Sequence, residues 1–170
     1  MFRQLSINYL ALLTMTFILG LSLFLFFFFW AISKMPSLNK TSADIAIPSM
    51  NAINKALKRP WLLVGFLLTP VAYLSCGFLT QYLSRHSGPL FFYLSGIIYV
   101  IGVVIVTGTI IEPLNFQLSQ VKSITAPDDY QRIWQSYSQK WQFWNKIRTL
   151  SSAIALSLFC IGCFFLFLYN

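Results

Sequence analysis

Four long apolar runs alternate with polar segments along the chain. The runs extend over residues 9–32, 61–83, 90–111 and 150–168, and none of them contains Lys, Arg, Asp or Glu. Each has roughly the 20 residues that a helix needs to cross the hydrocarbon of a bilayer. Because lipid offers no partners for backbone N–H and C=O groups, such runs form helices or closed barrels, and the alternation of a barrel strand is missing. The pattern predicts an all-α, integral membrane four-helix bundle.

The polar segment between the first two runs has its own helical pattern. Thr41-Ser42-Ala43-Asp44 resembles a capping box, and apolar residues follow at helical spacing as far as Leu57. Pro60 should stop this helix, and Pro48 would suit its first turn if the helix starts late. We expect a short amphipathic loop helix that lies against the bundle or the membrane interface.

The polar segment before the last run predicts a helix start. Thr125 can cap it, Pro127 fits its first turn and Asp128 complements its dipole. Gly162 is the first residue after Pro127 that would weaken a helix. We therefore predict one long last helix, from about Pro127 to Leu168, that extends out of the membrane.

Composition supports a single membrane domain over residues 1–170. The chain is 57% hydrophobic, 18% aromatic and 9% charged, which is more apolar than a soluble domain of this size tolerates. The first run follows Arg3 but exceeds the core of a secretory signal and lacks a small-residue cleavage site, so we expect a retained span.

The chain has a net charge of +8. In a membrane protein this charge indicates the orientation of the chain in the bilayer, and we expect no nucleic-acid partner. Ten cations lie in the two segments that follow the first and third runs, against two on the other side. We predict that both of these loops are cytoplasmic and both termini lie on the opposite side, in a bacterial inner membrane. The ten are Lys34, Lys40, Lys55, Lys58, Arg59, Lys122, Arg132, Lys140, Lys146 and Arg148, and the two are Arg3 and Arg85.

An aromatic stripe precedes the last run. Offsets of 3, 4, 3 and 4 place its members on one helix face, with Asn145 beside them. Two interpretations stay open: an interfacial aromatic belt with a packing seam, or the wall of a ligand site. The second gains support because unpaired polar groups at membrane depth are costly and need partners. The stripe consists of Trp134, Tyr137, Trp141, Trp144 and Arg148.

Glu112, the only Glu, closes the third run on the side of the bilayer where Arg148 begins the fourth. We predict an ion pair between them, either as part of a site or as a clasp between helices. Asn115 lies one turn from Glu112, and Pro113 frees a backbone carbonyl nearby. The predicted cavity has a floor of Glu112, Asn115, Asn145 and Arg148, walls of Trp134, Trp141 and Trp144, and a lid of Met50, Asn51 and Asn54.

Three groups of residues resemble the anthrone oxygenase-like family of small four-span membrane proteins. They are Met50-Asn51-Ala52-Ile53-Asn54 with Pro60, Glu112-Pro113-Leu114-Asn115 with Leu118, and Trp134 and Trp141 with the segment from Trp144 to Thr149. Fungal members of that family look like cofactor-independent oxygenases that convert polyketide anthrones to anthraquinones, whereas most bacterial members have no assigned activity.

The resemblance implies roles for the residues of the predicted site. An oxygenase of this kind asks for a flat aromatic slot, a base for a carbon-bound proton and donors for an enolate-like oxygen. Glu112 would be the base, Asn115, Asn145 and Arg148 the donors, and the three tryptophans of the stripe the slot. No cofactor is expected.

Three alternatives remain. Cys160-Ile161-Gly162-Cys163 is a pair typical of thiol oxidases that reduce quinones, but it lies inside a span and only Cys76 could serve as a further thiol. The chain could also be a binding or assembly subunit without chemistry, and a homo-oligomer is compatible with its apolar faces. Transport is the third, although Thr107-Gly108-Thr109 in span three better suits close helix packing. His86 stands alone in a polar turn, so no metal is expected.

Overall fold

The computed structural model describes residues 7–58, 60–83, 88–121 and 127–168. Nearly all of these residues are helical, and no strand occurs among them. Four helices are long and apolar enough to cross a membrane: Ile7–Leu38, Leu63–Tyr82, Gly88–Ser119 and Asp129–Leu168. The predicted all-α four-helix membrane bundle is confirmed. Thr125, Arg3, Arg85 and His86, on which parts of the sequence argument rest, lie outside the described residues.

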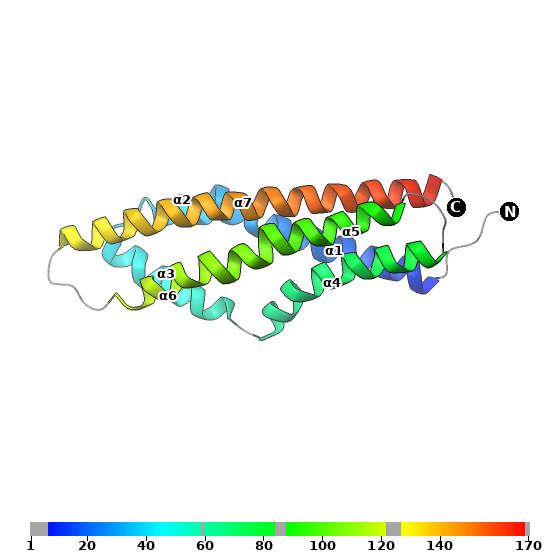
Figure 1. Cartoon of the computed structure of the whole chain (residues 1–170). Helices are drawn as coiled ribbons and strands as arrows, with labels where there is room; N and C mark the ends of the chain where they lie inside the picture. Colours follow the sequence, from blue (N-terminus) through cyan, green and yellow to red (C-terminus); the bar gives the residue numbers. More distant parts are fainter. Residues whose placement is uncertain (1–6, 59, 84–87, 122–126, 169–170) are drawn as a thin grey trace.

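The first long helix continues beyond its apolar run. Helix α1 (Ile7–Phe29) passes through the π-helical turn η1 (Trp30–Lys34) into α2 (Met35–Leu38). Figure 1 shows that α1 begins at the end of the bundle where α7 finishes, and that α2 lies beside the first part of α7. The last part of this helix, α2, therefore lies at the end of the bundle where α7 begins.

The third long helix also continues past its predicted end. It consists of α5 (Gly88–Tyr99), the π-helical turns η2 (Val100–Ile105) and η3 (Thr107–Ile111), and α6 (Glu112–Ser119). Pro113 lies in the first turn of α6 without ending the helix. The wider turn of η3 directly precedes it, which suits a residue that cannot complete an α-helical hydrogen bond. Glu112 therefore lies within a continuous helix rather than at the end of a span.

The last helix, α7, runs over Pro127–Leu168 as predicted. Its 42 residues have a length of about 63 Å at 1.5 Å per residue, roughly twice the thickness of the hydrocarbon. The first half of α7 thus extends beyond the spans, where Figure 1 shows it beside α2, α3 and α6.

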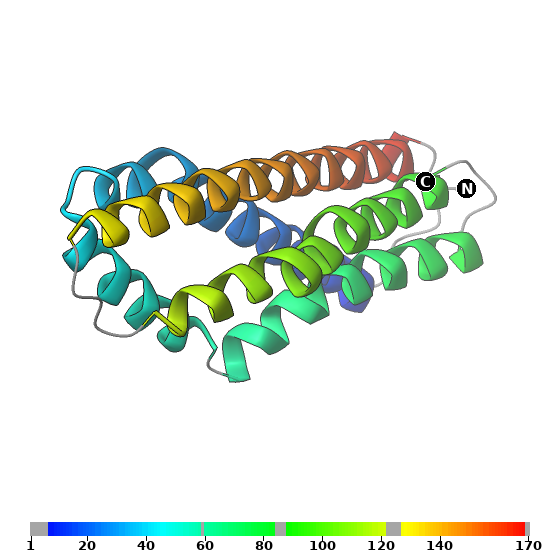
Figure 2. The ribbon, with the colours of Figure 1, turned by 60° about the vertical axis from the view of Figure 1, so that its left-hand side comes forward.

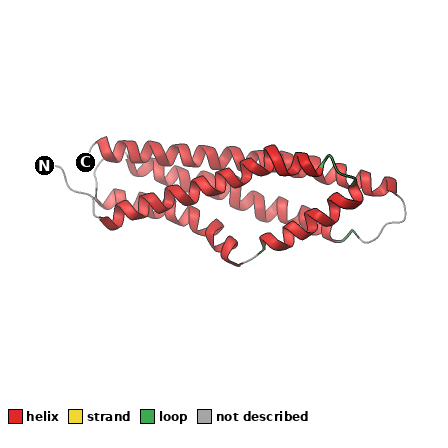
Figure 3. Ribbon diagram, turned by 180° about the vertical axis from the view of Figure 1, so that it is seen from behind, coloured by secondary structure: helices red, strands yellow, loops and turns green. Residues whose placement is uncertain are grey.

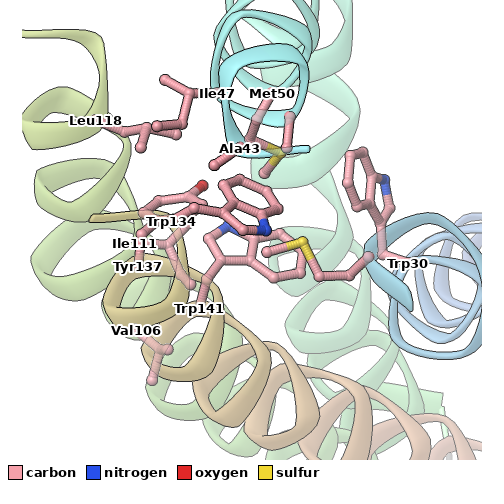
Figure 4. Packing of buried hydrophobic residues seen from close by; sticks show 12 residues of the cluster. Trp30, Ala43, Ile47, Met50, Val106, Ile111, Leu118, Trp134, Tyr137 and Trp141 are labelled. Atoms are coloured by element: carbon pink, nitrogen blue, oxygen red, sulfur yellow. The ribbon is translucent and has the colours of Figure 1, made fainter. Parts of the chain in front are cut away.

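Helix α3 (Ala43–Leu57) forms the cap together with α2, α6 and the first half of α7. The predicted capping box is wrong: Ser42 occupies the N-cap position, but its side chain makes no capping hydrogen bond. Pro48 lies inside the helix rather than in its first turn. Side chains from all of these elements meet in one apolar cluster, here called the cap cluster, whose inner faces appear in Figure 4. It contains Trp30, Met35, Ala43, Ala46, Ile47, Met50, Val106, Ile111, Leu118, Trp134, Tyr137 and Trp141.

Helix α4 (Pro60–Leu83) packs mainly on α5 and on the first part of α1. The contact with α1 begins where Tyr9 hydrogen-bonds to Thr80 and reaches Gly20, where the Tyr73 hydroxyl lies against the glycine backbone. Beyond Gly20 the two helices separate, and the first turns of α4 stand away from α1 and α7 in Figures 1, 2 and 3.

Candidate functional site

A cavity of about 500 Å³ lies between the cap cluster and the bundle. This volume falls within the roughly 300–1,000 Å³ of small-molecule sites. Its apolar lining consists of Leu23, Phe26, Phe27, Trp30, Leu57, Leu63, Phe66, Ile111 and Trp141. Its polar lining consists of Ser22, Asn54, Lys58, Thr107, Glu112, Asn115 and Arg148. A mostly apolar wall with a few polar groups is typical of a site that binds a small organic molecule.

Arg148 is the charged side chain deepest in this lining, with only 6% of its surface exposed. Its Nη2 donates to Asn145 Oδ1 at 2.8 Å, and its Nη1 donates to Thr107 Oγ1 at 3.3 Å. The guanidinium carbon lies 4.8 Å from the ring centre of Phe27 and 5.5 Å from that of Trp141. Aromatic faces and neutral acceptors, instead of a carboxylate, therefore surround this cation.

Asn145 is fully buried and joins two of the spans. Its Nδ2 donates to the backbone oxygen of Phe27 at 3.1 Å, while its Oδ1 accepts the hydrogen bond from Arg148. Asn145 does not line the cavity, and both ends of its amide are used by the protein. It is therefore a positioning residue, which fixes Arg148 relative to α1.

The predicted ion pair between Glu112 and Arg148 is wrong. Glu112 Oε2 lies 2.8 Å from Lys58 Nζ at the end of α3, and Glu112 Oε1 accepts from Asn115 Nδ2 at 3.4 Å. The side chains of Lys58 and Glu112 are 55% and 42% exposed. An ion pair costs less desolvation at this half-exposed edge than beside the buried guanidinium. Arg148 and Glu112 nevertheless border the same cavity.

Asn115 links this ion pair to α7. Its Oδ1 accepts a hydrogen bond of 2.8 Å from the Tyr137 hydroxyl, while its Nδ2 faces Glu112. Asn115 is buried and borders the cavity, as expected from the sequence. A continuous polar chain thus runs from Tyr137 through Asn115 and Glu112 to Lys58.

The three tryptophans of the stripe take different places. Trp141 borders the cavity, and its ring centre lies 5.4 Å from that of Trp30. Trp134 is buried in the cap cluster next to Tyr137, and Trp144 packs against the edge of that cluster. Trp134 and Trp144 are not part of the cavity lining. Figure 4 shows the rings of Trp134 and Trp141 in adjacent layers on α7, with Trp30 facing them from the first helix.

The residues of the predicted lid also lie in different places. Asn54 borders the cavity, whereas Asn51 donates to the Leu118 backbone oxygen at 3.3 Å and ties α3 to α6. Met50 is fully buried in the cap cluster.

Several lining residues were not predicted as site residues. Thr107 was assigned to helix packing, but its hydroxyl accepts from Arg148, and the neighbouring Gly108 is exposed with no side chain close to it. Lys58 carries a usable signal, since it is a cation at the end of an amphipathic helix. Phe26 and Phe27 lie in an unbroken run of phenylalanines, and nothing in that run marks which rings face inward.

Two buried donors of the lining make no hydrogen bond to the protein. They are Arg148 Nε and Trp141 Nε1. A buried donor without an acceptor costs about 1–3 kcal/mol. Two of them around one cavity favour a ligand that carries acceptor oxygens.

The three cysteines differ in burial and none forms a disulfide in this structure. Cys76, Cys160 and Cys163 are all free, and Cys160 is exposed on the outer face of the bundle. Within the described residues, no three His, Cys, Asp or Glu side chains are grouped so that they could hold a metal ion.

These features define a class: an integral membrane protein with four apolar helices and an internal cavity at one end of the bundle. The family model of the anthrone oxygenases matches residues 59–158. The chain belongs to the anthrone oxygenase family, and the resemblance inferred from its motifs is confirmed. The matched range includes Thr107, Glu112, Asn115, Trp141 and Arg148. No curated protein and no solved structure matches the chain.

Proposed function

We propose that the cavity binds a flat aromatic molecule that carries a carbonyl or phenol oxygen, and that the protein oxidises it as a cofactor-independent oxygenase. The single observation that carries the proposal is the pair of unpaired buried donors on Arg148 and Trp141 in a mostly apolar cavity. Family membership supplies the reaction class.

The reaction proposed here converts the methylene group of an anthrone to a carbonyl. The methylene loses two hydrogens, O₂ supplies the new carbonyl oxygen, and the second oxygen leaves with both hydrogens as water. Removal of the first proton gives an enolate whose negative charge collects on the oxygen across the ring. A charged donor at that oxygen lowers the barrier, which is the role we assign to Arg148.

Glu112 is the only carboxylate of the described cavity lining and is our candidate for the base. Its contacts with Lys58 and Asn115 hold the carboxylate in place at the edge of the cavity. The apolar lining of the cavity that Glu112 and Arg148 share has Trp30 and Trp141 as its largest rings. A flat ring system in this space would have the base and the oxyanion donor at separate points of its rim.

The test uses the full chain in lipid nanodiscs with 1,8-dihydroxyanthrone and O₂. We expect formation of 1,8-dihydroxyanthraquinone well above the rate in empty nanodiscs, together with matching O₂ consumption. Glu112→Gln should remove the acceleration. Asp129→Asn, which changes an acid outside the cavity lining, should leave it intact.

A second function, binding without chemistry, is favoured by the fact that both oxygens of Glu112 already have partners. Anaerobic titration with 1,8-dihydroxyanthraquinone separates the two, because Trp30 and Trp141 in the lining report occupancy through their fluorescence. Saturable quenching without turnover supports the binding function alone. Absence of both would refute the proposed site.

The side of the membrane on which the cap lies is part of the proposal. Lys34, Lys40, Lys55, Lys140 and Lys146 are exposed at this end of the bundle or half-exposed there, which supports a cytoplasmic cap. A fluorescent protein fused after Asn170 tests this placement, because we expect it to stay outside the cytoplasm and therefore dark. A bright fusion would reverse the orientation.

A further inference from the structure

The cavity has an edge on the lipid-facing side of the bundle, between α1 and α4. Among the lining residues, Ser22 and Phe26 on α1 and Leu63 on α4 are exposed, the last two by 37% and 48%. All three lie in segments that belong to candidate spans. The apolar interior of the cavity is therefore continuous with the surface that faces the hydrocarbon.

The helix contacts explain why an opening occurs there. The Tyr73 hydroxyl of α4 lies against Gly20 of α1, where a β-carbon of residue 20 would be. Farther along α1, Asn145 ties the Phe27 backbone to α7, whereas α4 makes most of its contacts with α5. The two helices thus separate in a fork (Figures 1 and 2). Phe26 belongs to α1 and Leu63 to α4, and both line the cavity.

We propose that the ligand enters this cavity sideways from the bilayer, through a portal between α1 and α4 bordered by Phe26 and Leu63. The inference rests on the proposed function and narrows its substrate class. The ligand is a lipophile that is dissolved in the membrane, and its oxygen-bearing end reaches Arg148 only after its rings have passed the portal. A water-borne polar metabolite does not fit this route, because the portal offers it apolar side chains.

The polar corner of the cavity fits this route. Lys58 and Glu112 form an ion pair in the lining and are about half exposed, whereas Arg148 is buried with 6% exposure. Phe66 belongs to the same lining as Arg148 and Trp141, so a ring system that enters between Phe26 and Leu63 meets an aromatic side chain and buried donors within one cavity.

The experiment measures binding rates of 1,8-dihydroxyanthraquinone by stopped-flow tryptophan quenching, with the full chain in nanodiscs. A residue that controls access changes the association rate, and because the ligand leaves through the same opening, the dissociation rate changes in the same direction. We expect Phe26→Ala to raise both rates several-fold and Leu63→Phe to lower both several-fold. The matched controls are Phe28→Ala and Leu68→Phe, which are exposed on the same helices but outside the lining.

Unchanged rates in both portal variants, or a changed Kd with an unchanged association rate, would overturn the portal. If the wild-type protein shows no saturable quenching, the proposed function fails and a second measurement still tests the portal. In nanodiscs of dibrominated phosphatidylcholine, acyl chains that enter the fork quench Trp30 and Trp141, which are otherwise buried. We expect Leu63→Phe to reduce this quenching relative to Leu68→Phe, and equal quenching would refute the opening.

Discussion

Arg148 donates to Asn145 Oδ1 at 2.8 Å, and Asn145 Nδ2 donates to the Phe27 backbone oxygen at 3.1 Å. A cation of the last helix is thus held by an amide three residues before it, and that amide anchors the first helix. One side chain thus contacts both the buried guanidinium and the backbone of the first helix. Asn145 therefore positions the site from outside the cavity lining, whereas Arg148 borders the cavity itself.

Asn145→Ala should destabilise the protein. The change leaves the Phe27 carbonyl and the Arg148 guanidinium short of partners, and a buried group without its hydrogen bond costs about 1–3 kcal/mol. Gln142→Ala is the control, because Gln142 donates only to Ser138 of its own helix. Unfolding of both variants in mixed detergent micelles measures the difference, and equal midpoints would contradict the role of Asn145.

The ion pair of Glu112 should contribute little to stability. Lys58 and Glu112 are about half exposed, and such pairs contribute under about 1 kcal/mol. Lys58→Met should therefore unfold close to the wild type in the same micelles, in contrast to Asn145→Ala. A loss as large as that of Asn145→Ala would show that the contact between α3 and α6 holds the cap together.

The four spans could be predicted from the sequence, because the position of each span depends on the hydrophobicity of one continuous segment. Helix α7 also follows directly, since no strong helix breaker interrupts Pro127 to Leu168. The continuation of the third helix to Ser119 was missed because the apolar run ends at Ile111, and the π turn that precedes Pro113 has no clear pattern in the sequence. The capping box predicted at Thr41 to Asp44 was wrong, because the residue types fit the motif but the Ser42 side chain makes no capping hydrogen bond.

The partner of Arg148 could not be predicted in the same way. Depth along the membrane suggested Glu112, but contact also depends on how each helix is rotated about its axis, which one sequence does not reveal. Asn145 lies one turn before Arg148 and was available as a local partner. Phe27 offers a backbone oxygen to Asn145 and a ring face to Arg148. Neither contact involves a polar side chain of Phe27, so the sequence does not mark it as a partner.

Gly20→Ala should destabilise the contact between α1 and α4. A β-carbon there would clash with the Tyr73 hydroxyl oxygen, and forced overpacking costs about 1–3 kcal/mol. Gly65→Ala is the control, because its β-carbon would meet no atom within 4 Å. Adding Tyr73→Phe removes the clashing oxygen and should recover much of the loss; unfolding of the single and double variants in micelles tests this. No recovery would place the strain elsewhere.

Arg148→Met should weaken binding of 1,8-dihydroxyanthraquinone. It removes the charged donor whose Nε has no protein partner, and a hydrogen bond to a charged group is worth about 1.5–3 kcal/mol, or roughly 10- to 150-fold in Kd. Lys146→Met is the control on the exposed side of the same helix. Anaerobic titration in nanodiscs measures both, and equal Kd values would remove Arg148 from the site.

Trp141→Phe tests whether the indole N–H serves the ligand or the fold. Trp141 Nε1 is buried without a hydrogen bond and borders the cavity, while the ring packs between Trp30 and Arg148. Phenylalanine keeps an aromatic face and removes the donor, so Kd for the anthraquinone should rise by about 2- to 10-fold, as expected for one neutral hydrogen bond. Trp144→Phe, outside the cavity, should leave Kd unchanged. If both variants unfold like the wild type but weaken binding equally, the indole of Trp141 makes no hydrogen bond to the ligand, and Arg148 is the buried donor that selects it.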